Sequence, residues 1–198
     1  KAAEGDILIS EIMANPSSAG RLPNVEYLEL WNKSDKIIDL NELQISSGAT
    51  PVGLGVGLFL PNTYYILCPL ENVEEFRAFG SVIGLKPFPG LSNTSDNLTL
   101  KTTGGLSLCQ VNYTNDWYRD EAKTQGGWAL ELIDANLSTD CPGNWAASID
   151  RKGGTPGTIN SIKNRITDFS GPQVFTSVSF TGKELLVVFD EPLDQTTA

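Results

Sequence analysis

The sequence predicts an all-β protein, either a sandwich or a barrel. Short runs rich in β-branched, aromatic and leucine residues recur along the chain, clusters of turn-forming residues separate them, and only one segment has the pattern of a helix. Many short strands joined by turns are typical of two-sheet sandwiches and barrels, whereas folds that alternate strands and helices need longer periodic segments.

The expected elements follow from these runs in chain order. The expected strands are 7–13, 25–31, 36–40, 43–47, 63–68, 98–102, 106–113, 128–133, 173–180 and 184–190. One helix is expected at 70–79, because acidic residues lie near its start, Val73 and Phe76 share an apolar face, and Gly80 follows it.

The composition excludes several classes of function. The chain has 198 residues, a formal net charge of −10 and no histidine. An acidic chain lacks the clustered Lys and Arg that neutralise phosphates, so we expect no nucleic-acid partner. Without histidine, Ser-His-Asp catalysis, Cys-His catalysis and zinc sites that contain histidine are also excluded.

The three cysteines do not form a recognisable framework. Cys68 and Cys109 lie in apolar alternating runs, so we expect both to be buried, and Cys141 lies in a turn-rich segment. None has the CxxC spacing of a zinc or redox site. One disulfide among the three would leave one thiol over, and the sequence alone does not decide whether it forms.

The chain carries no segment with the length and apolarity of a transmembrane helix. No charged stretch followed by an apolar one opens it, as a secretory signal would. A start at Lys1 rather than at methionine fits either an exported chain whose signal has been removed or a trimmed chain.

We expect a domain boundary near residue 160. The glycine-rich turn at 153–157 closes the first part, a polar linker is expected at 161–168, and 169–198 contains a new pair of strands joined at 181–183. Two strands cannot bury a core alone, so 169–198 is predicted to be part of a second domain. The expected hairpin, 173–190, either packs against the first domain or pairs its edge with a neighbouring molecule.

Several motifs of the first part together resemble a known family. They are GDILISEIMANP (5–16), EYLELWN (26–32), IDL (38–40), SDNLTL (95–100), GWALE (127–131), NWAAS (144–148), GGTPG (153–157) and Asn160. Their order and spacing resemble the bacterial, exported form of the lamin-tail domain over about residues 5–160. The resemblance implies an immunoglobulin-like β-sandwich. Two features depart from the family pattern: Glu42 stands where glycine is common, and the glycine-rich insert at 50–60 is long.

The second part resembles the opening of another bacterial domain. Asp168, Pro172 and Val174, with VFDEPLD at 188–194, are similar to the start of the immunoglobulin-like domain found in S-layer-associated proteins. The resemblance implies an exported, multi-domain chain that continues past Ala198.

One loop has the ligand pattern of a calcium site. Asp134, Asn136, Ser138 and Asp140 present side-chain oxygens at alternate positions, as the start of a calcium loop does. Thr139 replaces the glycine of such loops, and Trp145 replaces their final glutamate. The alternative is an Asx-rich turn between strands. We expect no other cofactor.

Carboxylates and aromatic residues offer two further candidate sites. Glu11, Glu29 and Glu131 lie on different expected strands and could approach one another, although no surrounding pattern supports glycosidase chemistry. Trp117 and Tyr118 lie in an expected loop and could form an exposed face that stacks on a sugar. The alternative is that Trp117 packs over an edge while Trp128 and Trp145 anchor the core.

The sequence therefore predicts a non-catalytic structural or interaction module, a spacer or adhesion domain of an exported bacterial protein. Its location would be the cell envelope, the cell surface or the medium, and its partner an envelope protein or a glycan. The alternative is an accessory carbohydrate-binding or calcium-dependent module of a secreted hydrolase.

Overall fold

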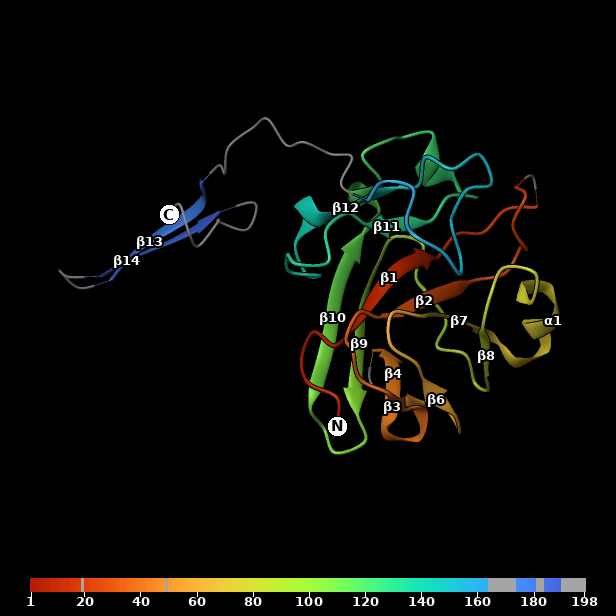
Figure 1. Cartoon of the computed structure of the whole chain (residues 1–198). Coiled ribbons are helices and arrows are strands. Elements are labelled where there is room, and N and C mark those ends of the chain that lie inside the picture. Colours follow the sequence, from red (N-terminus) through yellow and green to blue (C-terminus); the bar gives the residue numbers. More distant parts are fainter. Residues whose placement is uncertain (19, 49, 164–173, 181–183, 190–198) are drawn as a thin grey trace.

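Two β-sheets face each other across a shared apolar core (Figure 1). The computed structural model describes residues 1–18, 20–48, 50–163, 174–180 and 184–189, with backbone only for 174–180 and 184–186. Within these ranges the chain is mostly strand, so the predicted all-β class is confirmed.

The larger sheet has six strands in the order β12-β11-β1-β2-β7-β8 among the described residues. Its strands are β1 (Ile7–Met13), β2 (Tyr27–Asn32), β7 (Tyr64–Pro69), β8 (Val82–Leu85), β11 (Leu130–Leu132) and β12 (Trp145–Ala147). All its pairings are antiparallel except that of β7 with β8, which is parallel.

The smaller sheet has four described strands in the order β10-β9-β4-β5. They are β4 (Leu43–Ser47), β5 (Val52–Gly53), β9 (Ser95–Thr102) and β10 (Ser107–Thr114). Two pairs of strands stand apart from both sheets: β3 (Ile38–Asp39) with β6 (Leu58–Phe59), and β13 (Val174–Phe180) with β14 (Glu184–Phe189).

Helices are short in the described residues. The expected helix at 70–79 is instead a 3₁₀ turn (Leu70–Asn72) that runs into the single turn of α1 (Val73–Phe76). Further 3₁₀ turns are Leu40–Glu42, Asn115–Tyr118, Lys123–Gln125 and Pro142–Asn144. None of the helices in the described part of the chain is long and apolar enough to cross a lipid bilayer.

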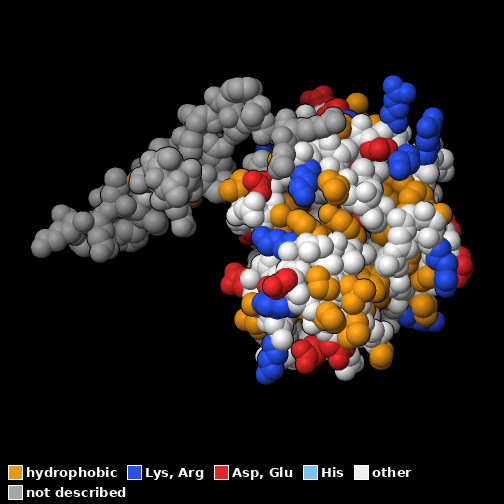
Figure 2. Space-filling model, in the orientation of Figure 1, with side chains coloured by type: hydrophobic (Ala, Val, Ile, Leu, Met, Phe, Trp, Pro, Cys, Tyr) orange, Lys and Arg blue, Asp and Glu red, His pale blue; other side chains and the backbone are white. Residues whose placement is uncertain are grey.

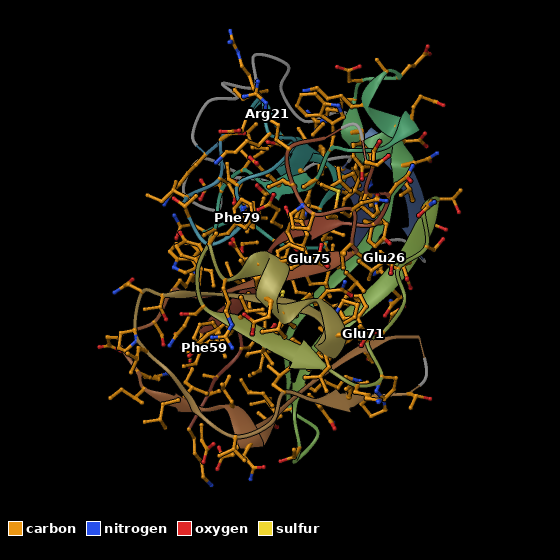
Figure 3. All side chains as sticks on the ribbon, turned by 90° about the vertical axis from the view of Figure 1, so that its right-hand side faces the viewer. Arg21, Glu26, Phe59, Glu71, Glu75 and Phe79 are labelled. Atoms are coloured by element: carbon orange, nitrogen blue, oxygen red, sulfur yellow. The ribbon has the colours of Figure 1, made fainter. Side chains whose placement is uncertain are left out.

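The strand predictions differ from the structure mainly where strands are short. The expected ranges 7–13 and 43–47 agree with β1 and β4, whereas β5, β6, β8 and β12 are not among the expected strands. β8 contains Gly84, where a Cβ atom would lie 2.8 Å from Leu70 Cδ1 and overlap Val73. Glycine thus lets the segment with α1 pack closely on β8 (Figure 3), although it weakens the local strand pattern.

Strand β1 is buried along its whole length. Ile7, Ile9 and Ile12 contribute to the core between the sheets. Because alternate residues of a strand face opposite ways, complete burial requires a cover on the outer face of the larger sheet as well. One part of that cover is α1, whose Phe76 packs with Met13. The other part is residues 153–162, which we call the strap.

The tryptophans occupy different depths. Trp145 is completely buried and stacks on Trp117, with ring centroids 6.2 Å apart. Trp128 is only half-buried, and Lys123 Nζ lies 4.5 Å from its ring centroid. The prediction that both Trp128 and Trp145 anchor the core therefore holds fully only for Trp145.

Two of the cysteines are buried as expected. Cys68 is a thiol, and burial, together with the nearby charge of Glu75, raises its pKa to about 11. Cys109 is a thiol whose Sγ accepts a hydrogen bond from Ile9 N at 3.4 Å. Cys141 is 8% exposed. Inert thiols of this kind act as small apolar side chains.

The packed body extends beyond the predicted end at residue 160. Ile162 is 2% exposed and packs with Ile133 and Ala146, so the start of the expected linker, 161–168, belongs to the body. The rest of that linker, 164–168, lies outside the described residues, as do 169–173, 181–183 and 190–198 of the second expected part. The predicted strands of the hairpin at 173–190 are present as β13 and β14, and the prediction that this hairpin pairs through its edge stays untested.

Truncating Trp145 to alanine should cost about 3–5 kcal/mol of unfolding free energy, because it removes a large, fully buried side chain. The same change at the half-buried Trp128 should cost clearly less. Denaturant midpoints of the two variants check the order. Equal losses would contradict the different depths described above.

Candidate functional site

Three glutamates form a row across the outer face of the larger sheet. Glu11 on β1 pairs directly with Glu29 on β2 and with Glu131 on β11. Directly opposed residues of antiparallel strands place their Cβ atoms about 4.5–5.5 Å apart. Their neighbours Leu28 and Leu130 pack into the core between the sheets, so alternation turns the carboxylates to the opposite face. The sequence expectation that these groups could approach one another is confirmed.

The strap covers this row, and all three glutamates are 0% exposed. Glu131 binds it at two points. Its Oε1 accepts a hydrogen bond from Thr155 Oγ1 at 2.9 Å, and its Oε2 accepts from Ser161 Oγ at 2.8 Å and from Ile162 N at 3.2 Å.

The other two carboxylates bind backbone amides of the strap. Glu11 Oε1 accepts from Thr155 N at 2.8 Å and from the Tyr27 hydroxyl at 2.8 Å. Glu29 Oε2 accepts from Gly157 N at 2.6 Å, and its Oε1 accepts from Ser10 Oγ at 2.7 Å. Backbone amides of a strand normally donate to carbonyl groups of a neighbouring strand. In this irregular segment the carboxylate oxygens serve as the acceptors instead.

Two glycines allow the strap to lie this close. A Cβ atom at Gly154 would lie 2.6 Å from the Tyr27 hydroxyl and overlap Glu11 Oε1. Gly157 has φ +81°, and a Cβ there would overlap the carbonyl oxygen of Phe79. Gly154 is required by the close approach alone, whereas Gly157 is required by both the close approach and the left-handed backbone.

Burial changes the protonation of Glu11 and Glu29. Removal from water raises the pKa of Glu11 well above its ordinary value, and the adjacent charges of Glu29 and Glu131 raise it further. Burial raises the pKa of Glu29 to about 8, against the effect of its hydrogen bonds from Ser10 and Gly157. Glu11 Oε2 has no hydrogen-bond partner among the described residues, which fits a neutral acid at the centre of the row.

The arrangement is suited to holding the fold and not to touching a substrate. A general acid or base must come within hydrogen-bond distance of the atom it serves, and the paired carboxylates of glycosidases flank a space for the sugar. Here the strap fills that space. The described residues contain no group of three or more His, Cys, Asp or Glu side chains placed to hold a metal ion.

The residues of the expected calcium loop have separate roles in the structure. Asp134 Oδ1 accepts from Asn136 N at 2.8 Å, and Ser138 Oγ accepts from Asp140 N at 3.2 Å. Both oxygens of Asp140 bind Asn112 on β10, from its N at 2.7 Å and its Nδ2 at 2.8 Å. These bonds form an Asx-rich loop that covers the free edge of β10, which was the alternative expectation.

The expected sugar-stacking face is wrong for Trp117 and Tyr118. They are 7% and 5% exposed and belong to the core between the sheets. Their 3₁₀ turn, Asn115–Tyr118, lies against β12, so Trp117 meets Trp145 and not the solvent. The alternative for Trp117, packing over an edge, agrees with its place against the edge strand β12.

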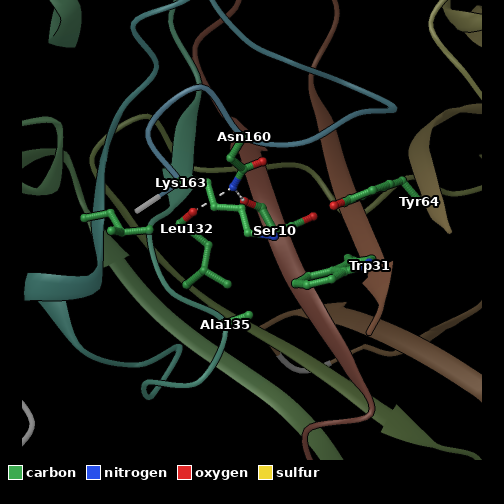
Figure 4. Close-up of a pocket in the computed structure, with 8 residues that line it drawn as sticks. Ser10, Trp31, Tyr64, Leu132, Ala135, Asn160 and Lys163 are labelled. Atoms are coloured by element: carbon green, nitrogen blue, oxygen red, sulfur yellow. Dashed lines mark hydrogen bonds between the residues drawn. The ribbon is translucent and has the colours of Figure 1, made fainter. Parts of the chain in front are cut away.

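A different aromatic pair borders the strap. Trp31 stacks on Tyr64 across neighbouring strands with ring centroids 5.6 Å apart, and Lys163 Nζ lies 5.0 Å from the Trp31 ring. These three residues line a small hollow together with Asn160 (Figure 4). Asn160 Nδ2 donates to Ser10 O and to Leu132 O, each at 2.8 Å. The hollow measures only about 20 Å³, which is the space of about one water molecule.

Sequence reasoning missed the partners of the carboxylates. The row accepts hydrogen bonds from Thr155, Gly157 and Ser161. From its sequence, however, the strap is predicted only to be a turn followed by a linker. One signal was present: each glutamate interrupts a run of apolar residues in an expected strand. A charged residue in such a position is buried only when it is paired.

Comparison with known proteins adds no identification. No model of a protein family matches this chain. A search of curated proteins finds none with significant similarity.

Replacing Thr155 with valine keeps the side-chain volume and removes one donor to Glu131. We expect a loss of about 1–3 kcal/mol, because a buried carboxylate oxygen is left without its partner. The amides of Gly157 and Ile162 should also exchange with solvent faster, as hydrogen exchange can measure. The exposed Thr158, replaced in the same way, is the control, and equal effects at both positions would contradict the role of Thr155.

Glu29→Gln should alter how stability depends on pH. The folded pKa of Glu29 lies near 8 and its ordinary value is 4.5, so between these values the folded state binds the additional proton. The contribution of Glu29 is therefore fully present below about pH 4.5 and is lost as pH rises through 8, by up to about 1.4 kcal/mol per pH unit.

The difference in unfolding free energy between the parent and Glu29→Gln should thus fall from pH 5 to pH 9. Denaturant unfolding across this range measures it. Glu42→Gln, at an exposed position, should give a difference that does not change over the same range. If the parent instead gained stability relative to Glu29→Gln as pH rose, the sign of the shift would be contradicted.

Proposed function

We propose that this chain is a non-catalytic structural or interaction module, a spacer or adhesion domain of an exported, multi-domain protein of the bacterial cell envelope. One observation carries the proposal. The three glutamates best placed for acid–base chemistry are completely buried and hold the strap against the larger sheet.

The finer fold assignment is part of this proposal. We infer an immunoglobulin-like β-sandwich of the lamin-tail type, which two facing sheets of mostly antiparallel strands support. Segments that carry the family resemblance also meet at one place. Glu11, Glu29 and Glu131 come from three of them, and they bind the strap, which contains GGTPG and Asn160.

A spacer must hold the point at which the chain leaves each domain. Among the residues that the structure describes up to 163, the strap is the last segment packed on the larger sheet, and hydrogen bonds to three different strands fix it there. Because Ile162 is also buried, force applied to the following chain would act on the carboxylate row before it reached the sheets. This arrangement suits a domain in a linear array.

The alternative, an accessory module of a secreted hydrolase, has less support in these residues. Its expected sugar-binding aromatics lie in the core. In its expected calcium loop, Asp134 Oδ1 binds within the loop and both oxygens of Asp140 bind β10. Function then depends on surfaces and loops, which commonly carry binding sites on rigid β scaffolds.

The chain should show no turnover of glycosides, esters, peptides or phosphodiesters above buffer controls. The physical reason is that its buried carboxylates cannot reach a substrate. Chromogenic substrates of each class, followed over a range of pH, measure this. Hydrolysis that is abolished by Glu29→Gln or Glu131→Gln would overturn the proposal.

A further inference from the structure

Three loops meet beside the strap and enclose a hollow of about 170 Å³. They are the loop that follows β1, the loop that precedes β11, and the turn at 150–153. Its lining includes one aromatic side chain, Trp128, and two basic ones, Arg151 and Lys152. The other lining residues are small: Ser17, Gly20, Gly126, Gly127 and Gly153. Since a water molecule takes about 30 Å³ in the liquid, the hollow has room for a group of several heavy atoms.

Backbone hydrogen bonds hold the three loops in place. Gly127 N donates to Asn15 O at 2.7 Å, and Ala129 N donates to Gly153 O at 2.7 Å. Gly153 has φ +98°, and a Cβ atom there would overlap the carbonyl oxygen of Gly127. The hollow is therefore formed before any ligand binds, which lowers the entropy cost of binding.

The rim is basic in a chain whose net charge is −10. Among the described residues, the ion pairs are Lys36 with Asp6 and Arg77 with Glu74, so neither Arg151 nor Lys152 is in one. The acidic residue of their own turn, Asp150, directs its Oδ1 to Lys152 N at 2.8 Å.

Two more cations lie close by. Arg21 follows Gly20 of the lining, and Figure 3 shows its side chain extending outward from this end of the molecule. Lys123 Nζ lies over the Trp128 ring and donates to Ser148 O at 2.7 Å. Figure 2 shows Lys and Arg side chains projecting at the upper right of the face, where Figure 1 places the loop after β1 and the strap. Asp120 and Glu121 are the acidic residues of the Lys123 loop, and Asp120 Oδ1 accepts from Ala122 N at 3.0 Å.

We propose that this hollow binds an acidic saccharide, with its carboxylate or sulfate group held by Arg151 and Lys152 and its ring against Trp128. A guanidinium matches the two oxygens of such a group, and an ammonium adds a point charge. The inference rests on the function proposed above, because it specifies the partner of that interaction module as an acidic glycan.

The size and the charge favour a saccharide over other anionic partners. A protein partner needs about 800 Å² of matching surface on each side, whereas this site is a small hollow with one aromatic wall. A nucleic acid presents a dense row of phosphates that the acidic surface beyond the rim would repel. A saccharide with one charge on each ring would place that charge at the basic rim. At physiological salt the screening length is about 8 Å, so acidic residues farther away would repel the bound charge only weakly.

Calorimetric titration of the whole 198-residue chain tests the proposal. The probes are trigalacturonate, a sulfated trisaccharide and an uncharged galactose trisaccharide. We expect both charged probes to bind, with affinity that falls as salt is raised, and the uncharged probe to bind at least tenfold more weakly. The double variant Arg151→Ala/Lys152→Ala should weaken binding of the charged probes at least tenfold.

A matched control removes the same charge elsewhere. Lys86→Ala/Lys101→Ala changes two exposed lysines and should alter the affinity less than twofold. Unchanged denaturant midpoints should show that both double variants are folded. No binding of either charged probe, or equal losses in the two double variants, would overturn the proposal. Equal affinity for triglutamate would overturn the assignment to a saccharide.

The same samples separate this proposal from the proposed function. Binding without hydrolysis of the probe supports both. Hydrolysis of a bound probe would overturn the non-catalytic function and leave the site in place. Absence of both binding and hydrolysis overturns the site alone.

Discussion

Hydrogen bonds from the strap to three buried carboxylates close the outer face of the larger sheet. A carboxylate removed from water is costly unless it is neutralised or bonded, and like charges on adjacent strands add to that cost. Burial and the adjacent charges raise the pKa of Glu11. Donors of the strap bind one oxygen of Glu11, one oxygen of Glu29 and both oxygens of Glu131. The strap and the larger sheet therefore stabilise each other, because separating them would leave carboxylates of the sheet and amides of the strap without hydrogen-bond partners.

This dependence also restricts where function can lie. The acidic groups that the sequence offers for catalysis stabilise the fold, and the aromatic residues of the expected sugar-binding loop lie in the core. We therefore propose that contacts with a partner are made by the loops at the sheet ends. Several of these loops are held by backbone hydrogen bonds and carry exposed side chains such as Arg151, a combination that suits binding.

The strap and the basic hollow share one residue. Gly153 begins the strap, accepts a hydrogen bond from Ala129, and lies against Gly127 in the wall of the hollow. The bonds that hold the strap to the carboxylates thus also support the turn that carries Arg151 and Lys152. A positioned turn holds its side chains near one another with little loss of entropy on binding.

The sequence by itself determined the all-β class and the positions of β1 and β4. Short apolar or alternating runs bounded by turn residues predict strands from local sequence alone. It also indicated which glutamates stood out from their surroundings. Only the tertiary structure decided that Glu11 meets Thr155, because 144 residues separate them along the chain. The same holds for the parallel pairing of β8 and for the burial of Trp117, which depend on what packs over each face and not on the neighbouring residues. A local pattern shows that a side chain must be covered, but the segment that covers it is chosen by the packing of the whole chain.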